Sequence, residues 1–64
     1  MNWPKIIKAI RAKMFITQTE LAEKIDVSFA SVNRWEQGYH EPTMKAKRKL
    51  AQICHEIGID MEAL

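Results

Sequence analysis

The segment from Thr17 to Gly38 constrains the fold more than any other stretch, because it encodes two short helices joined by a tight turn. Thr17 and Glu20 have the spacing of a capping box, which fixes the start of the first helix. Ser28 is a good N-cap for the second helix, and Gly38 supplies the usual cap at its C-terminal end. The sequence therefore predicts a helix-turn-helix unit whose second helix covers residues 28–37.

The second helix of this unit has one apolar and one polar side. Val32 and Trp35 are its only strongly apolar pair at helical spacing, so they mark the side that faces the core. The opposite side carries Ala30, Asn33, Arg34 and Gln37, with Phe29 and Ser31 near the boundary. This outward side has no acidic residue and is rich in hydrogen-bonding groups, which suits insertion into the major groove of DNA.

The unit and its flanks resemble the XRE-type helix-turn-helix domains of phage repressors, Cro proteins and small bacterial regulators. The resemblance covers roughly residues 5 to 54 and rests on Thr17-Gln18, Glu20-Leu21-Ala22, Val27-Ser28, Val32, Trp35-Glu36, Gly38 and Pro42-Thr43. Because polar, apolar and turn positions agree together, it is more specific than a bare helix-turn-helix pattern. It implies an all-α fold, a compact four- to five-helix bundle of the phage-repressor type.

The resemblance also implies a function, sequence-specific binding of double-stranded DNA by a small prokaryotic or phage transcriptional regulator. The residues expected to contact base edges are Phe29, Ala30, Asn33 and Arg34. Those expected to contact DNA phosphates are Gln18, Ser28, Ser31, Thr43 and Lys45. In addition, Arg11 is expected to form an ion pair with Glu36 and so to tie the first helix to the end of the reading helix.

Two residues depart from the pattern of the family at its helix junctions. Phe15 stands between the first two helices, where Gly or Asn usually allows a left-handed cap, and a bulky residue there costs about 1 kcal/mol or more. We therefore expect Phe15 to recover this cost by burial, or the loop to differ. Asp26 replaces the usual turn glycine at a position that often needs positive φ, which Asp tolerates better than most residues.

The remaining chain encodes two longer helices and a short C-terminal turn. Asn2 can cap a first helix with Pro4 in its opening turn, and the buried stripe of this helix is Trp3, Ile6, Ile7, Ile10 and Met14. Pro42-Thr43 opens the fourth helix, Gly58 ends it, and its buried stripe is Met44, Ala46, Leu50, Ile53, Cys54 and Ile57. Asp60 is expected to cap one last turn.

Length and composition set limits on the class of protein. With 64 residues, of which 47% are hydrophobic and 28% charged, the chain is expected to form one globular domain over residues 1–64. Cys54 is the only cysteine, and neither His40 nor His55 has partners at zinc-ligand spacing, so we expect no disulfide, metal or cofactor. No nucleophile, base and oxyanion donor converge, so an enzyme is not expected. No apolar run is long enough to span a membrane, and we expect a cytoplasmic protein.

The net charge is only +2, but its distribution is uneven. Basic residues gather in two segments, and acidic ones near the C-terminus: Lys5, Lys8, Arg11 and Lys13; Lys45, Lys47, Arg48 and Lys49; and Glu56, Asp60 and Glu62. The two basic segments either present one surface to phosphates or are ordinary solvated helix faces.

Other interpretations remain open from the sequence. The same domain would suit an antitoxin, or the DNA-targeting module of a restriction-modification system, where a protein partner matters as much as DNA. A helical bundle that only binds protein is a third interpretation, supported by Phe29 on the outward side. The apolar residues Ile57, Ile59, Met61 and Leu64 either mediate weak homodimerisation or close the core of the monomer.

Overall fold

The computed structural model describes residues 1–64, which fold into four α-helices and a final 3-10 turn without any strand. The elements are α1 (Trp3–Met14), α2 (Gln18–Lys24), α3 (Phe29–Gln37), α4 (Met44–Ile57) and the 3-10 turn η1 (Met61–Ala63). The prediction of an all-α helix-turn-helix bundle is confirmed, and α3 begins one residue after its cap, Ser28.

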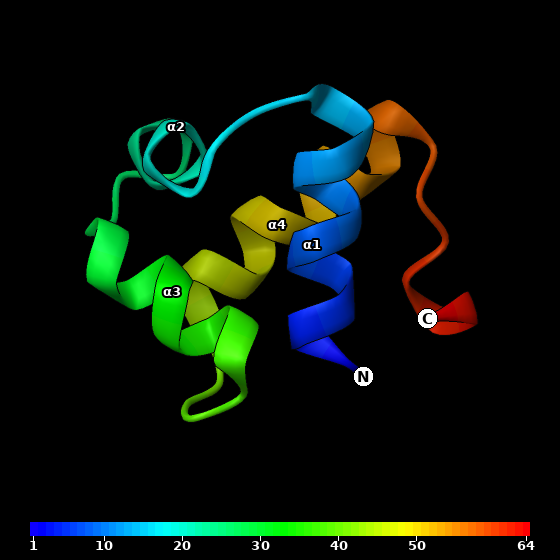
Figure 1. The fold of residues 1–64 in the computed structure, drawn as a ribbon. Helices are drawn as coiled ribbons and strands as arrows, with labels where there is room; N and C mark the ends of the chain where they lie inside the picture. Colours follow the sequence, from blue (N-terminus) through cyan, green and yellow to red (C-terminus); the bar gives the residue numbers. More distant parts are fainter.

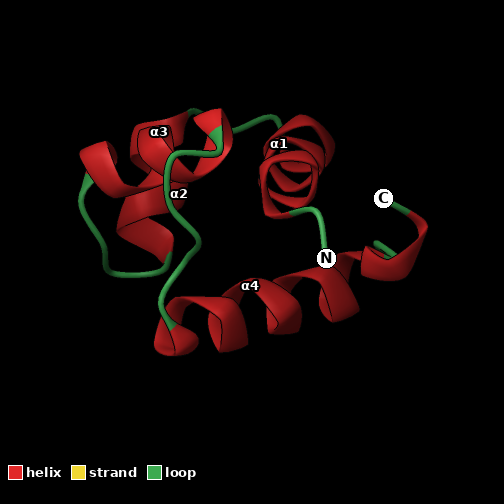
Figure 2. Ribbon diagram, turned by 90° about the horizontal axis from the view of Figure 1, so that it is seen from below, coloured by secondary structure: helices red, strands yellow, loops and turns green.

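The helices are arranged around α1 and α3. In Figure 1, α2 and α3 lie on one side of α1 and the C-terminal turn lies on the other. Figure 2 shows α4 running across the molecule on one side of the other three helices. The most extensive contacts are those of α3 with α1 and with α2, so the reading helix predicted from the sequence is held by two partners.

Every helix begins with a side-chain cap at the expected residue. The side chains of Asn2, Thr17, Ser28 and Thr43 accept hydrogen bonds from the backbone N–H groups of Lys5, Glu20, Ser31 and Ala46. The capping box of α2 is complete, because the Glu20 carboxylate accepts the Thr17 N–H at 2.9 Å. The last turn also begins as predicted, with the Asp60 side chain accepting from the N–H of Glu62.

The four α-helices end in a similar way, with a residue at positive φ. The φ values are 57° at Phe15, 59° at Asp26, 81° at Gly38 and 78° at Gly58. The N–H of the following residue then bonds back to a carbonyl of the last turn, as in a Schellman motif: Ile16 to Arg11, Val27 to Ala22, Tyr39 to Arg34 and Ile59 to Cys54. The chain therefore reverses sharply after each helix, and the positive φ expected at Asp26 is confirmed.

The expectation for Phe15 is wrong. Phe15 keeps the left-handed conformation, and the residue is 93% exposed. The cause is the reversal itself, because it turns Ile16 toward the core, where it packs against the buried cluster, and leaves Phe15 pointing into solvent. The strain at Phe15 is thus not compensated by burial.

The core is assembled from all four helices. Its fully buried side chains are Ile6, Ile7, Ile10, Leu21, Ile25, Val32, Leu50 and Cys54, with Trp3, Ala22, Trp35 and Ala46 nearly so. Met44 is a second correction, because it is 63% exposed instead of buried. At 3.6 residues per turn it points away from the side of α4 that carries Ala46 and Leu50, and Pro42 is buried just before the helix.

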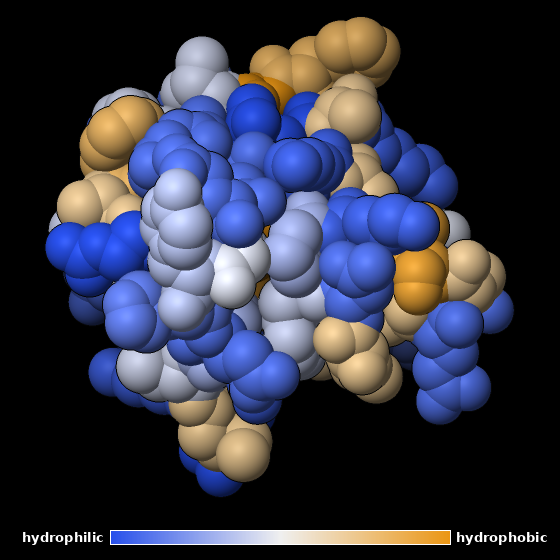
Figure 3. Space-filling view, turned by 60° about the horizontal axis from the view of Figure 1, so that its bottom comes forward, coloured by the Kyte–Doolittle hydropathy of each residue, from blue (hydrophilic) through white to orange (hydrophobic).

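The C-terminal segment packs against this core. Ile57, Ile59 and Met61 are partly buried and contact the core cluster, whereas Leu64 is 40% exposed. Figure 3 shows a face covered mainly by hydrophilic side chains, with the apolar ones in small groups near its edge. The contacts of the three partly buried residues favour closure of the monomer's own core.

Candidate nucleic-acid interface

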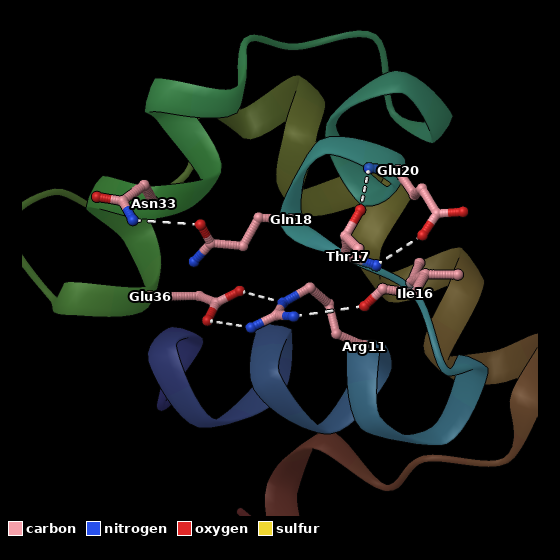
Figure 4. Close-up of polar contacts among 7 residues, drawn as sticks. All are labelled: Arg11, Ile16, Thr17, Gln18, Glu20, Asn33 and Glu36. Atoms are coloured by element: carbon pink, nitrogen blue, oxygen red, sulfur yellow. Dashed lines mark hydrogen bonds and ion pairs between the residues drawn. The ribbon is translucent and has the colours of Figure 1, made fainter.

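The Arg11–Glu36 ion pair, which the family resemblance implied, is present and links three parts of the fold. Arg11 Nε donates to Glu36 Oε2 at 2.5 Å and Nη2 to Oε1 at 2.9 Å. The remaining nitrogen, Nη1, donates to the carbonyl of Ile16 at 3.3 Å. Figure 4 shows the guanidinium between α1, the loop before α2, and α3. A planar bidentate contact of this kind fixes orientation as well as distance, so it sets how α3 sits on α1.

Both members of the pair are charged. Burial by itself raises the pKa of Glu36, but hydrogen bonds from Arg11 and Gln18, with the charges of Arg11 and Lys8, lower it overall. The hydrogen bond to Glu36 raises the pKa of Arg11. Because Glu36 is the only acidic residue of α3 and its side chain is 4% exposed, its charge is neutralised inside the protein. The exposed surface of α3 therefore carries no negative charge.

The amides of Gln18, Asn33 and Gln37 join the start of α2 to the outward side of α3. Asn33 Nδ2 donates to Gln18 Oε1 at 3.2 Å, and Gln37 Nε2 donates to Asn33 Oδ1 at 2.7 Å. Figure 4 shows Gln18 reaching from α2 toward both Asn33 and Glu36. Two residues expected to contact different parts of DNA, Gln18 and Asn33, thus contact each other directly.

The N-terminal half of α3 presents the other expected contact residues. Phe29 is 51% exposed, and Ala30 and Arg34 are exposed on the same helix. Ser28 and Ser31 bond each other, with their hydroxyl oxygens 3.0 Å apart and the Ser31 N–H donating to Ser28. Each hydroxyl can still form a further hydrogen bond.

The expected contacts at α4 lie on a separate element. Thr43 caps α4 through the N–H of Ala46 at 3.2 Å, and Lys45 is exposed in its first turn. No hydrogen bond joins these two residues to the side-chain amides of α2 and α3. They extend the candidate surface from the helix-turn-helix unit to the start of α4.

Two other lysines of α4 have structural partners. Lys47 pairs with Glu41 at 3.0 Å, and its Nζ lies 5.8 Å from the centre of the Trp3 ring. Lys49 donates to the carbonyl of Ile25 at 3.1 Å, at the end of α2. The basic segment of α4 is therefore divided between internal contacts and free charges.

The hydrogen bonds made by Gln37 and Lys49 were not predicted from the sequence. The spacing of Asn33 and Gln37, four residues apart on a helix, is one at which amides commonly pair, so this contact had a local signal. The contact of Lys49 with Ile25 had no local signal in the sequence, because it depends on how α4 crosses the end of α2.

The structure contains no group of three His, Cys, Asp or Glu side chains that is placed to hold a metal ion. None of its helices is long and apolar enough to cross a membrane.

Comparison with known proteins gives one finding. A family model described as helix-turn-helix, HTH_3, matches residues 7–62 and so includes all four helices except the start of α1. No curated protein and no solved structure matches the chain.

Proposed function

The chain belongs to the XRE-type helix-turn-helix family HTH_3, whose members are DNA-binding domains of the transcription-regulator type, and we propose that it is a sequence-specific regulator of prokaryotic or phage genes. One observation carries the proposal beyond family membership. The acidic residue of α3 is buried against Arg11, and the only charge that the helix exposes is that of Arg34. Such a helix can approach the negative phosphates that line a groove without electrostatic repulsion.

In this proposal α3 enters the major groove with its N-terminal end foremost. Phe29 and Ala30 have no side-chain hydrogen bond to offer, but they can pack on the methyl groups of thymine. Asn33 and Arg34 have hydrogen-bonding groups for base edges, with guanine as the favoured partner of Arg34. We therefore expect a half-site with thymine near Phe29 and Ala30 and guanine near Arg34.

The phosphate contacts in this proposal come from three helix starts. Gln18 begins α2, Ser28 and Ser31 lie at the start of α3, and Thr43 and Lys45 lie at the start of α4. The N–H groups at the start of a helix attract anions, and lysine adds a full charge. These contacts would hold α3 in register on the duplex without carrying sequence information themselves.

Selection of bound sequences from a random pool of DNA duplexes tests the proposal. We expect one enriched motif, with an affinity that falls steeply as salt concentration rises, because bound phosphates release counterions. A palindromic motif would also indicate a dimer on DNA and report the half-site spacing. The proposal would be contradicted if the selection enriched no motif and the affinity for DNA did not depend on salt concentration.

A protein-binding role is the second candidate, because Phe29 is half-exposed on the outward side of α3. Substituting uracil for thymine across the selected site removes only methyl groups and so separates the two roles. If Phe29 reads thymine, uracil should weaken binding by the wild type but not by Phe29→Ala. Unchanged affinity of the wild type would favour a protein contact for Phe29, as in an antitoxin or a module of a larger assembly.

A further inference from the structure

The hydrogen bonds among Gln18, Asn33 and Gln37 form a chain with a direction. Gln37 donates to Asn33, and Asn33 donates to Gln18. A single amide can be turned over, which exchanges its donor and acceptor atoms. Within a chain, however, all amides must turn together, since each donor needs an acceptor. One fixed group at the end of the chain is therefore enough to set the orientation of every member.

The Glu36 carboxylate is such a group. An ionised carboxylate only accepts hydrogen bonds, and the bidentate contact with Arg11 keeps Glu36 ionised and immobile. Figure 4 shows the amide nitrogen of Gln18 on the side of Glu36 and its oxygen toward Asn33. Turning Gln18 over would place its oxygen against the carboxylate. Gln18 must therefore offer its oxygen to Asn33, and Asn33 must offer its own oxygen to Gln37.

Asn33 is consequently held from both ends. Its nitrogen is bonded to Gln18 on α2, and its oxygen to Gln37, one turn farther along α3. It retains one N–H and one lone pair, which is the donor and acceptor set that complements N7 and N6 of adenine in the major groove. A side chain that is already ordered also loses less rotational entropy when it binds.

We propose that Gln37 is a positioning residue for DNA recognition, which acts through Asn33. Gln18 sets which way the Asn33 amide faces, and the hydrogen bond from Gln37 holds the amide still in that orientation, with its free N–H and lone pair placed to discriminate adenine. The inference rests on the proposed function, since it concerns how one base is read. Gln37 is exposed at the last residue of α3, away from the end of the helix that approaches the groove most closely. Its contribution is the hydrogen bond to Asn33, not a contact with a base.

Two variants separate this role from a direct contact. Gln37→Met keeps the length of the side chain but removes the donor, whereas Gln37→Lys restores a donor to the Asn33 oxygen. Gln52→Met, an exposed glutamine on α4, is the matched control. The base pair to examine is the one at which Asn33→Ala relaxes the preference for adenine. Circular dichroism verifies that each variant is folded.

The measurement is the ratio of affinities for adenine and for each other base at that position. An added charge, as in Gln37→Lys, changes the affinity for all sequences by the same factor, and this factor drops out of the ratio. We expect Gln37→Met to reduce it by about fivefold or more, the lower end of what a good amide–adenine pair contributes. Gln37→Lys and Gln52→Met should retain the wild-type ratio. In the free proteins, the side-chain NMR signals of Asn33 should shift in Gln37→Met much more than in Gln37→Lys.

Several outcomes would overturn the inference. An unchanged ratio in Gln37→Met would mean that Asn33 needs no positioning, and equal weakening for all four bases would make Gln37 a backbone contact. An Asn33→Ala variant that relaxes no position would remove the reader itself. If the wild type binds no DNA, the proposed function fails first, and the inference falls with it. That case is distinguishable because the free-protein NMR spectra still report whether Gln37 orders Asn33.

Discussion

At the scale of single residues, two residues of the structure carry an energetic cost. The cost of burying Glu36 is compensated, but the backbone strain at Phe15 is not. Glu36 is buried but fully paired with Arg11, and no buried side-chain polar atom in the protein lacks a partner. Phe15, by contrast, combines positive φ with almost complete exposure. Substitutions at these residues should therefore have opposite effects on stability.

Replacing Phe15 with glycine should stabilise the fold. Relief of left-handed strain is worth about 1–2 kcal/mol, and the added entropy of glycine in the unfolded chain costs about 0.5–1 kcal/mol. We expect a net gain of about 0.5–1 kcal/mol in the free energy of unfolding, measured by urea denaturation. Phe15→Ala keeps the Cβ atom and should gain little. A loss of stability in Phe15→Gly would show that the ring makes contacts in solution.

The Arg11–Glu36 pair should make stability depend on pH. The pKa of Glu36 is lower in the folded than in the unfolded chain, so its contribution is complete above the unfolded pKa. It should be lost as pH falls through the lowered folded pKa. Urea denaturation at decreasing pH should therefore show a steeper acid loss in the wild type than in Glu36→Gln. Parallel curves for the two proteins would contradict this assignment.

The outward charge of α3 should affect DNA and not the fold. Arg34 is exposed, so Arg34→Ala should change the free energy of unfolding by less than about 0.5 kcal/mol. If Arg34 reads guanine, the variant should lose about 1–3 kcal/mol of binding free energy and relax preference at one base pair. Equal weakening on all sequences, with the salt slope reduced by about one unit, would assign Arg34 to a phosphate instead.

At the scale of elements, the reversal that ends each helix determines which side chains enter the core. The residue after the positive-φ position turns inward at Ile16, Val27 and Ile59, and all three pack against the core. After α3 the corresponding residue, Tyr39, is 72% exposed. The loop from α3 to α4 is held instead by buried Pro42 and by the contact of Glu41 with Lys47.

The lysines of α4 provide a matched pair for separating structural from DNA-binding roles. Lys49 donates to the Ile25 carbonyl at the end of α2, so Lys49→Met should cost about 0.5–1.5 kcal/mol of stability. The exposed Lys45 has no such contact, and Lys45→Met should leave stability unchanged while reducing the salt slope of DNA binding by about one unit. Both variants are measured by urea denaturation and by salt titration of DNA binding. A loss of stability in Lys45→Met and a reduced salt slope in Lys49→Met would contradict this assignment.

At the scale of the whole molecule, a chain of 64 residues has little stability to lose. The C-terminal segment contributes to this stability, because Ile59 and Met61 pack on the core and the Ile59 N–H donates to the carbonyl of Cys54 at 2.8 Å. The side chain of Cys54 is itself buried, and this burial raises the pKa of its thiol. The segment is therefore better described as the closing layer of the core than as a free tail.

Ending the chain at Gly58 tests this description. We expect the shorter protein to lose about 2 kcal/mol of unfolding free energy, corresponding to two partly buried apolar side chains. Sedimentation of both proteins in the absence of DNA should give monomers. A full-length dimer that becomes a stable monomer on truncation would instead assign Ile59, Met61 and Leu64 to an interface between two copies.

The sequence by itself determined where the helices begin and end. Caps such as Thr17 and Ser28 act on N–H groups three residues away, so their effect is local and readable without the fold. The turn at Asp26 and the stripe of α1 were predictable for the same reason. The Arg11–Glu36 pair, separated widely in sequence, was accessible only through resemblance to a family.

The tertiary structure decided what depends on the crossing of elements. It directed Lys49 to the end of α2 and linked Asn33 on α3 to Gln18 on α2. Helical periodicity gives the side of a helix on which a residue lies, but not the depth at which a neighbouring helix covers it. Hydrogen bonds between helices likewise need distances correct to a fraction of an ångström, which the packing of all four helices sets together.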